Sequence, residues 1–313
     1  MKITAIAGGV GGAKMVDGLA QCLEPGDLSV IVNTGDDFEH FGLSISPDLD
    51  TVCYTLAGLS NDVTGWGRSG ESWRIIEQIK NLGGPTWFNI GDLDLATHLE
   101  RTRQLKDGKN LSQITQSLCE RWGVTHPVYP MSDSPVRTMV NTLEQGWLTF
   151  QEYFVKYQFQ PVMKEYRFEN IENAYLPEEA KNALVNADWV ILCPSNPFVS
   201  IDPVLKVNGV EQILEKKNVI AVSPIVGGKA IKGPAAKMFL ELGIQPSAYE
   251  VLRKFRHFIN AYVVQFGDGT EIQTQPHWNI IIKEMDTIMS DRAARKRLAM
   301  DILNFLETYR GEI

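Results

Sequence analysis

A glycine loop near the start of the chain has residue types suited to binding a phosphate. It contains Gly8, Gly9, Gly11 and Gly12. Glycines allow backbone N–H groups to approach a phosphate closely, and a helix that begins at such a loop adds its positive end. The loop starts like the dinucleotide-binding fingerprint, but Lys14 stands where the third glycine belongs. A tight strand-to-helix turn without a ligand is therefore the alternative interpretation.

A group of acidic residues follows within a short stretch, and it comprises Asp36, Asp37, Asp48 and Asp50. Carboxylates at the end of a strand are suitable ligands for Mg²⁺, which binds through one or two carboxylates together with substrate phosphates. The alternative is structural, because Asp48 could cap a helix that begins near Leu49 and the other aspartates could shape turns. The residue types alone leave both interpretations open.

A second acidic stretch with Asp92 and Asp94 leads into His98 and Arg101. These last two residues are three apart and share one face of a predicted helix, which could be aimed at a substrate. A structural histidine is the alternative. The arginines are otherwise scattered, and we expect most of them to form surface ion pairs of little energetic value, in a set that includes Arg68, Arg74, Arg101, Arg103 and Arg137.

Two further polar loops occur in the second half of the chain. Ser195 and Asn196 stand between two prolines, whose restricted backbone angles could fix these side chains for contact with a purine or a ribose. Gly227, Gly228 and Lys229 form another glycine-rich loop with a positive charge, which could bind phosphate. The alternatives are an ordinary turn and a solvated loop.

The elements that must position these residues follow from the apolar pattern. Apolar runs at 2–7 and 28–32 flank a helical pattern, and the runs at 189–193 and 219–222 also stop at turn-rich loops. This alternation predicts an α/β protein with a Rossmann-like parallel sheet. Ligands bind beyond the carboxyl ends of such strands, so the polar loops should converge on one site. A last amphipathic helix at 298–309 should pack on the core.

The chain is predicted to divide into a core and an insertion. Residues 1–50 and 173–313 should form the Rossmann-like nucleotide-binding core. Residues 51–172 should form a smaller inserted lobe, helical at first, with a hairpin of strands at 136–143 and 147–157. This lobe is expected to cover the substrate site.

Composition excludes some classes of function. The chain has 313 residues, 44% of them hydrophobic and 22% charged, which is typical of a globular protein. The net charge of −8 argues against a nucleic-acid-binding protein. No apolar run is long enough for a membrane span, so no membrane partner is expected. The four cysteines form no Cys-x-x-Cys pair and are expected to be reduced thiols of a cytoplasmic protein.

Seven motifs, taken in order, resemble the 2-phospho-L-lactate transferase family of coenzyme F420 biosynthesis. They are Gly-Gly-Val-Gly-Gly-Ala (8–13), Val-Asn-Thr-Gly-Asp-Asp (32–37), Pro-Asp-Leu-Asp-Thr (47–51), Gly-Asp-Leu-Asp-Leu-Ala-Thr-His (91–98), Pro-Met-Ser-Asp (130–133), Pro-Ser-Asn-Pro (194–197) and Ala-Val-Ser-Pro-Ile (221–225). The resemblance covers nearly the whole chain, and seven ordered motifs are far more specific than one glycine loop.

The resemblance implies a Mg²⁺-dependent transferase. Such an enzyme joins the ribityl hydroxyl of the deazaflavin FO to the phosphoryl group of lactyl- or enolpyruvyl-diphosphoguanosine and releases GMP. It also implies a homodimer with a Rossmann-like core and a smaller lobe. Phosphoryl transfer demands mainly positioning and charge neutralisation, which glycine loops, a metal ion and a few cations can supply.

The resemblance also assigns expected roles to individual residues. The expected metal ligands are Asp36, Asp48 and Asp50, and the residues expected to act in catalysis are Asp36, Asp37 and Asp50. The guanosine diphosphate part of the donor is expected at Gly8, Gly9, Gly11, Gly12, Ser195, Asn196, Gly228 and Lys229. The deazaflavin or the acid is expected to face Asn33, Thr34 and His98.

The chain departs from the archaeal pattern of the family. It has Gly-Val-Gly and Gly-Asp-Asp where archaeal members tend to have Gly-Thr-Gly and Ala-Glu-Asp. These variants look more like bacterial members, many of which use the enolpyruvyl donor. The donor acid therefore stays open among lactyl, enolpyruvyl and phosphoglyceryl.

Two rival functions make different demands on the sequence. A related family of nucleotide-sugar-binding regulatory proteins shares the glycine loop and the Pro-Ser-Asn-Pro motif, but is not expected to need the motifs at 47–51 and 91–98 together. A dinucleotide oxidoreductase should have the complete third glycine and a separate acidic residue for the ribose. The transferase accounts for more of the motifs than either rival.

Overall fold

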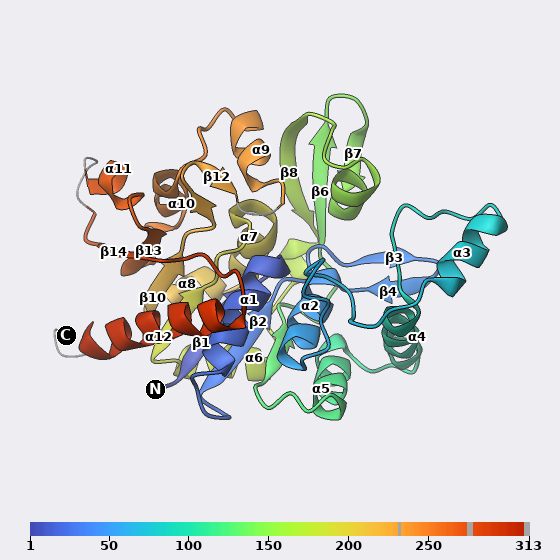
Figure 1. The fold of residues 1–313 in the computed structure, drawn as a ribbon, viewed down its shortest axis with the longest axis horizontal. Helices are drawn as coiled ribbons and strands as arrows, with labels where there is room; N and C mark the ends of the chain where they lie inside the picture. The colour runs from blue at the N-terminus through green and yellow to red at the C-terminus, as the bar shows by residue number, and fades with distance from the viewer. Residues whose placement is uncertain (231–232, 274–277, 310–313) are drawn as a thin grey trace.

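The computed structural model describes residues 1–230, 233–273 and 278–309 of the chain. Within these ranges, seven parallel strands form the central sheet, in the order β14-β13-β10-β9-β1-β2-β5 (Figure 1). The strands are β1 (Ile3–Ala7), β2 (Leu28–Val32), β5 (Val128–Pro130), β9 (Trp189–Leu192), β10 (Asn218–Val222), β13 (Ala261–Gln265) and β14 (Ile281–Met285). The predicted α/β class and parallel sheet are confirmed.

The strand order reverses at the centre of the sheet. From β1 the chain proceeds through β2 to β5 on one side, whereas β9 pairs with the other edge of β1 and leads to β10, β13 and β14. In an open parallel sheet, such a reversal leaves a crevice beyond the carboxyl ends of the two adjacent strands. The topology therefore places a candidate ligand site beyond the ends of β1 and β9.

Helices cover both faces of the sheet. One face packs against α1 (Gly9–Ala20), α2 (Pro47–Leu56), α5 (Leu111–Arg121) and α12 (Arg292–Tyr309). The opposite face packs against α6 (Glu178–Asn186), α7 (Asp202–Leu205), α8 (Val210–Leu214), α9 (Ala235–Glu241) and α10 (Ala248–Phe255). Because successive strand residues alternate between faces, Ala5 and Ile6 join different clusters of the core. Burial on both faces explains why these strands appear in the sequence as continuous apolar runs.

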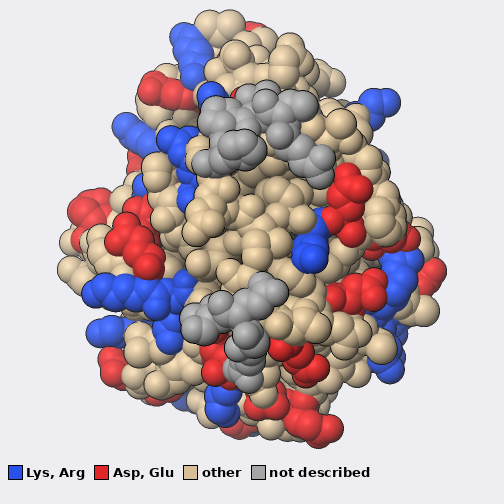
Figure 2. All heavy atoms as spheres, turned by 90° about the vertical axis from the view of Figure 1, so that its left-hand side faces the viewer, with Lys and Arg blue, Asp and Glu red and all other residues tan. Residues whose placement is uncertain are grey.

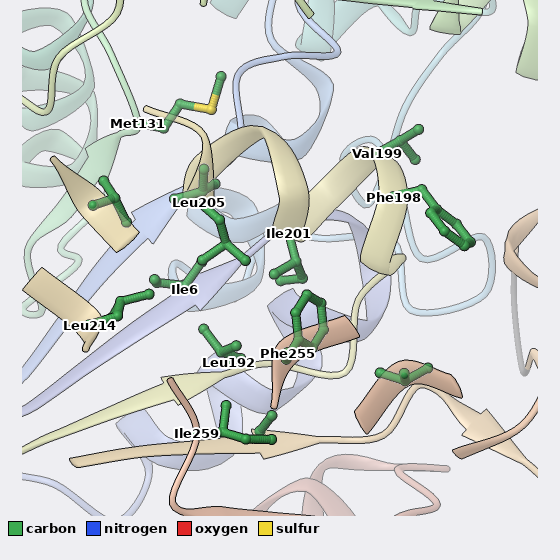
Figure 3. Close-up of a cluster of buried hydrophobic side chains, with 14 of the residues drawn as sticks. Ile6, Met131, Leu192, Phe198, Val199, Ile201, Leu205, Leu214, Phe255 and Ile259 are labelled. Atoms are coloured by element: carbon green, nitrogen blue, oxygen red, sulfur yellow. The ribbon is translucent and has the colours of Figure 1, made fainter. Parts of the chain in front are cut away.

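The core beneath the crevice fixes the segment that follows β9. Figure 3 shows Ile6 of β1 and Leu192 of β9 close to Ile201 and Phe255, and all four side chains belong to one buried cluster. Ile201 ends a π-helical turn, Pro197–Ile201, that follows Ser195 and Asn196 directly. Burying an aliphatic or aromatic side chain stabilises a fold by roughly 1.5–3 kcal/mol, so this packing holds the loop after β9 over the ends of the strands.

The remaining elements lie around this core. An antiparallel sheet of β6 (Arg137–Thr142), β7 (Gly146–Thr149) and β8 (Met163–Glu169) forms a separate lobe, with a π-helical turn at Glu152–Lys156 and a 3₁₀ turn at Ile171–Asn173. An arm that projects from the body in Figure 1 contains the hairpin β3 (Phe38–His40) and β4 (Leu43–Ile45), together with α3 (Arg74–Asn81) and α4 (Asp92–Lys106). Smaller elements are β11 (Ile225–Val226), β12 (Lys229–Ala230) and α11 (Gly269–Gln273).

The strand predicted at 147–157 is wrong in its second half. It ends at Thr149 and a π-helical turn follows. The carboxylate of Glu152 accepts hydrogen bonds from both the backbone N–H and the hydroxyl of Thr149, which turns the chain out of the strand. The last helix also begins earlier than predicted, at Arg292, because Asp291 accepts the N–H of Ala294 and caps it.

The stretch 51–172 does not lie wholly outside the core. Within it, β5 pairs with β2 in the central sheet, and α2 extends across the predicted boundary after residue 50. Pairing of β5 with β2 joins residues about a hundred positions apart, which local sequence patterns do not reveal. Of the other elements in this stretch, α5 packs on one face of the central sheet, α3 and α4 belong to the arm, and β6, β7 and β8 form the antiparallel lobe.

The outer surface carries charges of both signs. On the face shown in Figure 2, Lys and Arg side chains alternate with Asp and Glu side chains around a centre that is mostly uncharged. Across the described ranges, no helix combines the length and the apolar character that crossing a bilayer requires.

Candidate functional site

Three polar loops meet at the predicted crevice. The hydroxyl of Ser195 donates to the carbonyl oxygen of Gly8 at 2.7 Å and accepts the Gly8 N–H at 3.4 Å. The side-chain amide of Asn33 donates to Asp48 Oδ2 at 2.9 Å and to the carbonyl oxygen of Val199 at 3.1 Å. The loops after β1, β2 and β9 are therefore joined directly by hydrogen bonds, as their places at the ends of neighbouring parallel strands predict.

The glycine loop has a packing role that its sequence does not reveal. A Cβ on Gly11 would lie 2.1 Å from the carbonyl oxygen of Pro194, and a Cβ on Gly12 would lie 2.7 Å from Ser195 Oγ. Gly9 has a φ of +59°, a conformation that favours glycine. These glycines let the start of α1 approach the loop after β9 closely.

The first turn of α1 already faces an anionic group. The backbone N–H of Gly9 donates to the carboxylate of Asp48, which lies at the start of α2. Carboxylates stabilise helix N-termini because the N–H groups there carry partial positive charge. Asp48 thus contacts the amino-terminal end of α1. The alternative interpretation, in which Asp48 caps a helix that begins near Leu49, is wrong, because α2 begins at Pro47 and its N-cap position is Ser46.

The aspartates after β2 are buried close to one another. Burial raises the pKa of Asp36 well above its ordinary value, and the charges of Asp48 and Asp37 raise it further. Burial raises the pKa of Asp37 to about 7, against a hydrogen bond from Ser46 and the charge of Arg137. Burial also raises the pKa of Asp48 to about 6, against hydrogen bonds from Asn33 and the Gly9 backbone. A cation among these groups would favour their charged forms.

Several of these carboxylate oxygens have no hydrogen-bond partner. Among the described residues, Asp36 Oδ1, Asp37 Oδ1 and Asp50 Oδ2 are buried without a hydrogen bond. Buried polar atoms are nearly always paired, and carboxylate oxygens are the ligands that Mg²⁺ prefers. The residues present therefore fit a bound divalent cation.

Asp50 belongs to a second group of charged side chains that links α2 to α4. The guanidinium of Arg101 donates to Asp50 Oδ1, and its Nη1 atom lies 3.2 Å from His98 Nδ1. Arg101 is only 1% exposed. Our expectation that most arginines form surface ion pairs is wrong for Arg101, because the folding of α4 against α2 places its guanidinium beside a buried carboxylate.

The outer part of this group comes from α4 itself and from α2. Asp94 Oδ1 accepts the hydroxyl of Tyr54 at 2.7 Å, and Asp94 Oδ2 lies 3.3 Å from His98 Nε2. Sequence analysis did not single out Tyr54. The spacing of Asp94, His98 and Arg101, at steps of four and three, is the signal that places all three on one helix face.

The other predicted site residues differ in their surroundings. Thr34 is buried in the crevice, where its carbonyl oxygen accepts the Asp37 N–H at 3.2 Å. His98 is 1% exposed and lies within the charged group described above. The side chain of Asn196 accepts the N–H of Phe198 at 3.0 Å, which caps the π-helical turn.

Gly228 and Lys229 lie in an exposed hairpin formed by β11 and β12. The hairpin is held by hydrogen bonds from the Gly227 N–H to the carboxylate of Asp268. In the part of the chain that the structure describes, no hydrogen bond or ion pair joins Gly228 or Lys229 to the aspartates of the crevice. These two residues are therefore not brought into the group of joined loops.

A doubly wound sheet whose crevice joins a glycine loop to buried carboxylates defines this chain as a Rossmann-like α/β protein. The family model described as 2-phospho-L-lactate transferase CofD matches residues 3–304. The chain belongs to this family.

Similar proteins carry two different names. A phosphoenolpyruvate transferase of Kitasatospora aureofaciens is 36% identical over 99% of this chain and 99% of its own length. A 2-phospho-L-lactate transferase of Methanospirillum hungatei is also 36% identical, over 97% of this chain and 100% of its own length. A solved structure of a UPF0052-family protein from Bacillus halodurans aligns with a TM-score of 0.56 at 14% identity, covering 95% of this chain and 89% of that protein, which supports the fold alone.

Proposed function

We propose that this protein is a transferase of coenzyme F420 biosynthesis that moves a phospholactyl or phosphoenolpyruvyl group. The donor would be lactyl- or enolpyruvyl-diphosphoguanosine, the acceptor the ribityl hydroxyl of the deazaflavin FO, and the leaving group GMP. Family membership supports the class of reaction. The observation that carries the proposal is that buried carboxylate oxygens without hydrogen bonds lie in the same group of aspartates as Asp48, which contacts the glycine loop.

The magnesium site of this proposal consists of the aspartates of the crevice. Asp36 and Asp48 influence each other electrostatically, and Asp37 acts on Asp36 in the same way. Asp50 would contribute the oxygen that Arg101 leaves free. A bound Mg²⁺ would neutralise charge on the phosphates of the donor.

The transfer itself is a displacement at phosphorus. The hydroxyl oxygen of FO forms a bond to the phosphorus that carries the acid, and the bond from that phosphorus to the oxygen of GMP breaks. The hydroxyl proton passes to a carboxylate, for which Asp37 is our choice because burial raises its pKa to about 7. Asp50, which the sequence also offered for this role, is paired with Arg101.

The loops around the aspartates would bind the rest of the substrates. We propose that the loops at Gly8–Gly12 and Ser195–Asn196, which contact each other at the strand ends, hold the guanosine diphosphate part. Asn33 and Thr34 lie next to the aspartates and would face the acid or the deazaflavin. His98 is buried, and its Nδ1 atom lies 3.7 Å from Asp50 Oδ2, so it would position Asp50 and would not contact the substrate directly.

Two properties of the whole protein belong to the same proposal. Family resemblance supports a homodimer. A cytoplasmic location belongs to the same proposal and agrees with cysteines that form no Cys-x-x-Cys pair.

A mass-spectrometric assay tests the reaction and selects the donor. The protein is incubated with FO, Mg²⁺ and each of three donors, namely lactyl-, enolpyruvyl- and phosphoglyceryl-diphosphoguanosine. We expect one donor to give GMP and the matching FO conjugate. Relatives of both names match at the same 36% identity, so identity does not select the donor. Binding of a nucleotide sugar without conjugate formation would favour the regulatory protein instead.

The same assay, carried out on the variant Asp36→Asn, tests the proposed magnesium site. This variant keeps the shape of the side chain but removes one carboxylate from the proposed magnesium site, and we expect the rate to fall at least about 100-fold. Asp286→Asn, far from the crevice in sequence and paired with Arg297, is the control and should keep the wild-type rate. Equal rates for the two variants would remove Asp36 from the mechanism.

A further inference from the structure

Beside the proposed magnesium site lies a second set of side chains of the kind that bind metal ions. Asp50, Asp94 and His98 are buried, and each offers one ligand atom within 4.8 Å of the others. Two carboxylates and an imidazole suit divalent metals such as Zn²⁺ and Co²⁺. Asp50 Oδ2 and His98 Nε2 make no hydrogen bond within the described structure. By residue type, this set alone would predict a second metal ion.

The guanidinium of Arg101 already lies among these side chains. It donates to Asp50 Oδ1 and also to the carbonyl oxygen of Ser44, at 3.3 Å. An arginine guanidinium keeps its proton in proteins, and here its charge is paired with the Asp50 carboxylate. Arg101 is therefore a permanent positive charge in the middle of the group.

Arg101 also determines which ring nitrogen of His98 accepts a hydrogen bond. A guanidinium has only donors, so His98 Nδ1, at 3.2 Å from Nη1 of Arg101, must be the acceptor. The ring proton then lies on Nε2, which faces Asp94 Oδ2 at 3.3 Å. Neither nitrogen has a lone pair left for a metal ion. Removing Arg101 would release the Nδ1 lone pair and leave Asp50 without its partner.

We propose that Arg101 is a built-in cation that takes the place of a metal ion between Asp50, Asp94 and His98, so that each chain binds one divalent ion and not two. The first ion is the magnesium of the proposed function, on which this inference rests. Asp36 and Asp48 would hold it together with Oδ2 of Asp50, because the guanidinium of Arg101 binds only Oδ1 of that carboxylate. Arg101 thus supplies the positive charge among Asp50, Asp94 and His98, and the metal ion supplies it among the aspartates at the strand ends.

Metal titration distinguishes this arrangement from a two-metal site. Wild-type protein is titrated with Co²⁺ by calorimetry, and the visible absorption of bound Co²⁺ is recorded. We expect about one ion per chain in the wild type and about two in Arg101→Met, because the vacated position regains an imidazole lone pair and two carboxylates. Adding His98→Gln to Arg101→Met should abolish the second ion and its absorption.

Matched variants control for loss of the arginine itself. Arg101→Lys keeps the positive charge and should bind about one ion, as the wild type does. Arg103→Met removes an exposed arginine from the same helix, where it pairs with Glu100 and Asp107, and should leave the stoichiometry unchanged. Removing one partner of a buried ion pair is costly, so folding of every variant is checked by circular dichroism. If Arg101→Met unfolds without metal, its recovery by Co²⁺ supports the inference and a failure to recover opposes it.

The outcomes separate this inference from the proposed function. Two ions in the wild type, one of them lost in His98→Gln, would overturn the role of Arg101. One ion in folded Arg101→Met would overturn it as well. No ion in the wild type would count against the magnesium site of the proposed function, and the inference would then be decided by whether Arg101→Met gains a His98-dependent ion.

Discussion

Asp36, Asp37 and Asp48 show how burial can prepare acidic side chains for a cation. The pKa values of all three are raised chiefly by loss of contact with water. Asp36 and Asp37 each keep one oxygen without a hydrogen bond, whereas Asp48 accepts a hydrogen bond from the glycine loop. An acidic group that is buried and unpaired is destabilising unless a positive charge joins it. Protonation or a bound cation would each remove this cost, and the proposed magnesium site relies on the second.

The glycine loop gives the first prediction for a single residue. Gly11→Ala should lower the free energy of unfolding by about 3 kcal/mol, because its Cβ would lie 2.1 Å from the Pro194 carbonyl oxygen and neither backbone can yield easily. Urea unfolding measures the loss. Val10→Ala, one residue earlier in α1, is the control and should cost about 1 kcal/mol or less. Similar losses for the two variants would show that the loop is not closely packed against Pro194.

The helix α4 carries His98 and Arg101, and its position depends on a cap from a distant part of the chain. The carboxylate of Glu71 accepts the N–H of Leu93 at 2.7 Å and the N–H of Asp94 at 2.8 Å. A side-chain acceptor at a helix N-terminus satisfies N–H groups that have no partner within the helix. Glu71 thereby fixes the end of α4 that lies nearest the charged group.

Removal of this cap tests its importance for the helix. Glu71→Ala should lower the free energy of unfolding by about 1–2 kcal/mol, since two helix N–H groups lose their partner. It should also speed hydrogen exchange of the first α4 amides. Glu77→Ala on α3 replaces another glutamate of the arm that is exposed, and should change neither quantity appreciably. Unchanged exchange in Glu71→Ala would mean that α4 is held by other contacts.

The arm and the central sheet both supply side chains to the candidate site. The sheet supplies the loops that carry the glycines, Asn33 and Ser195, whereas the arm supplies Arg101 and His98. The hairpin of β3 and β4 leaves the core directly after Asp37 and returns just before Ser46. Asp37 and Ser46 are joined by a hydrogen bond of 2.7 Å, which closes the base of the arm.

Stability of the whole protein should depend on pH in a direction set by these acids. In the metal-free protein, burial raises the pKa of Asp37 to about 7 and of Asp48 to about 6, whereas an unfolded aspartate has a pKa of about 3.9. Between these values the folded state binds more protons than the unfolded state, so stability is lost as pH rises through about 4 to 7. Lowering the pH from about 8 to about 6 should therefore raise the Tm of metal-free protein.

Two controls identify the cause of this pH effect. Asp37→Asn should weaken the dependence of Tm on pH, because the substituted side chain does not titrate. Saturating Mg²⁺ should raise the wild-type Tm more at about pH 8 than at about pH 6, since a cation favours the ionised carboxylates. If the Tm of Asp37→Asn depends on pH as strongly as the Tm of the wild type does, other groups cause the effect.

Much of the sheet could be predicted because its strands are locally distinctive. The strands β1, β2, β9 and β10 are buried on both faces, so each appears as a short apolar run that stops at polar loop residues. The strands β13 and β14 were not predicted, and β14 mixes apolar with charged residues at the edge of the sheet. Edge strands have one partner and more contact with water, which weakens the local signal.

The sequence by itself determined the α/β class, the order of the polar motifs and the acidic residues of the crevice. Residue types and their spacing along neighbouring strand ends were enough, because parallel strands bring their carboxyl ends to one edge. Only the tertiary structure decided that Arg101 is buried beside Asp50, that Asp48 contacts the start of α1, and that Gly228 and Lys229 lie in a separate hairpin. These features depend on contacts between segments distant in the chain, and burial and charge pairing arise only when such segments pack together.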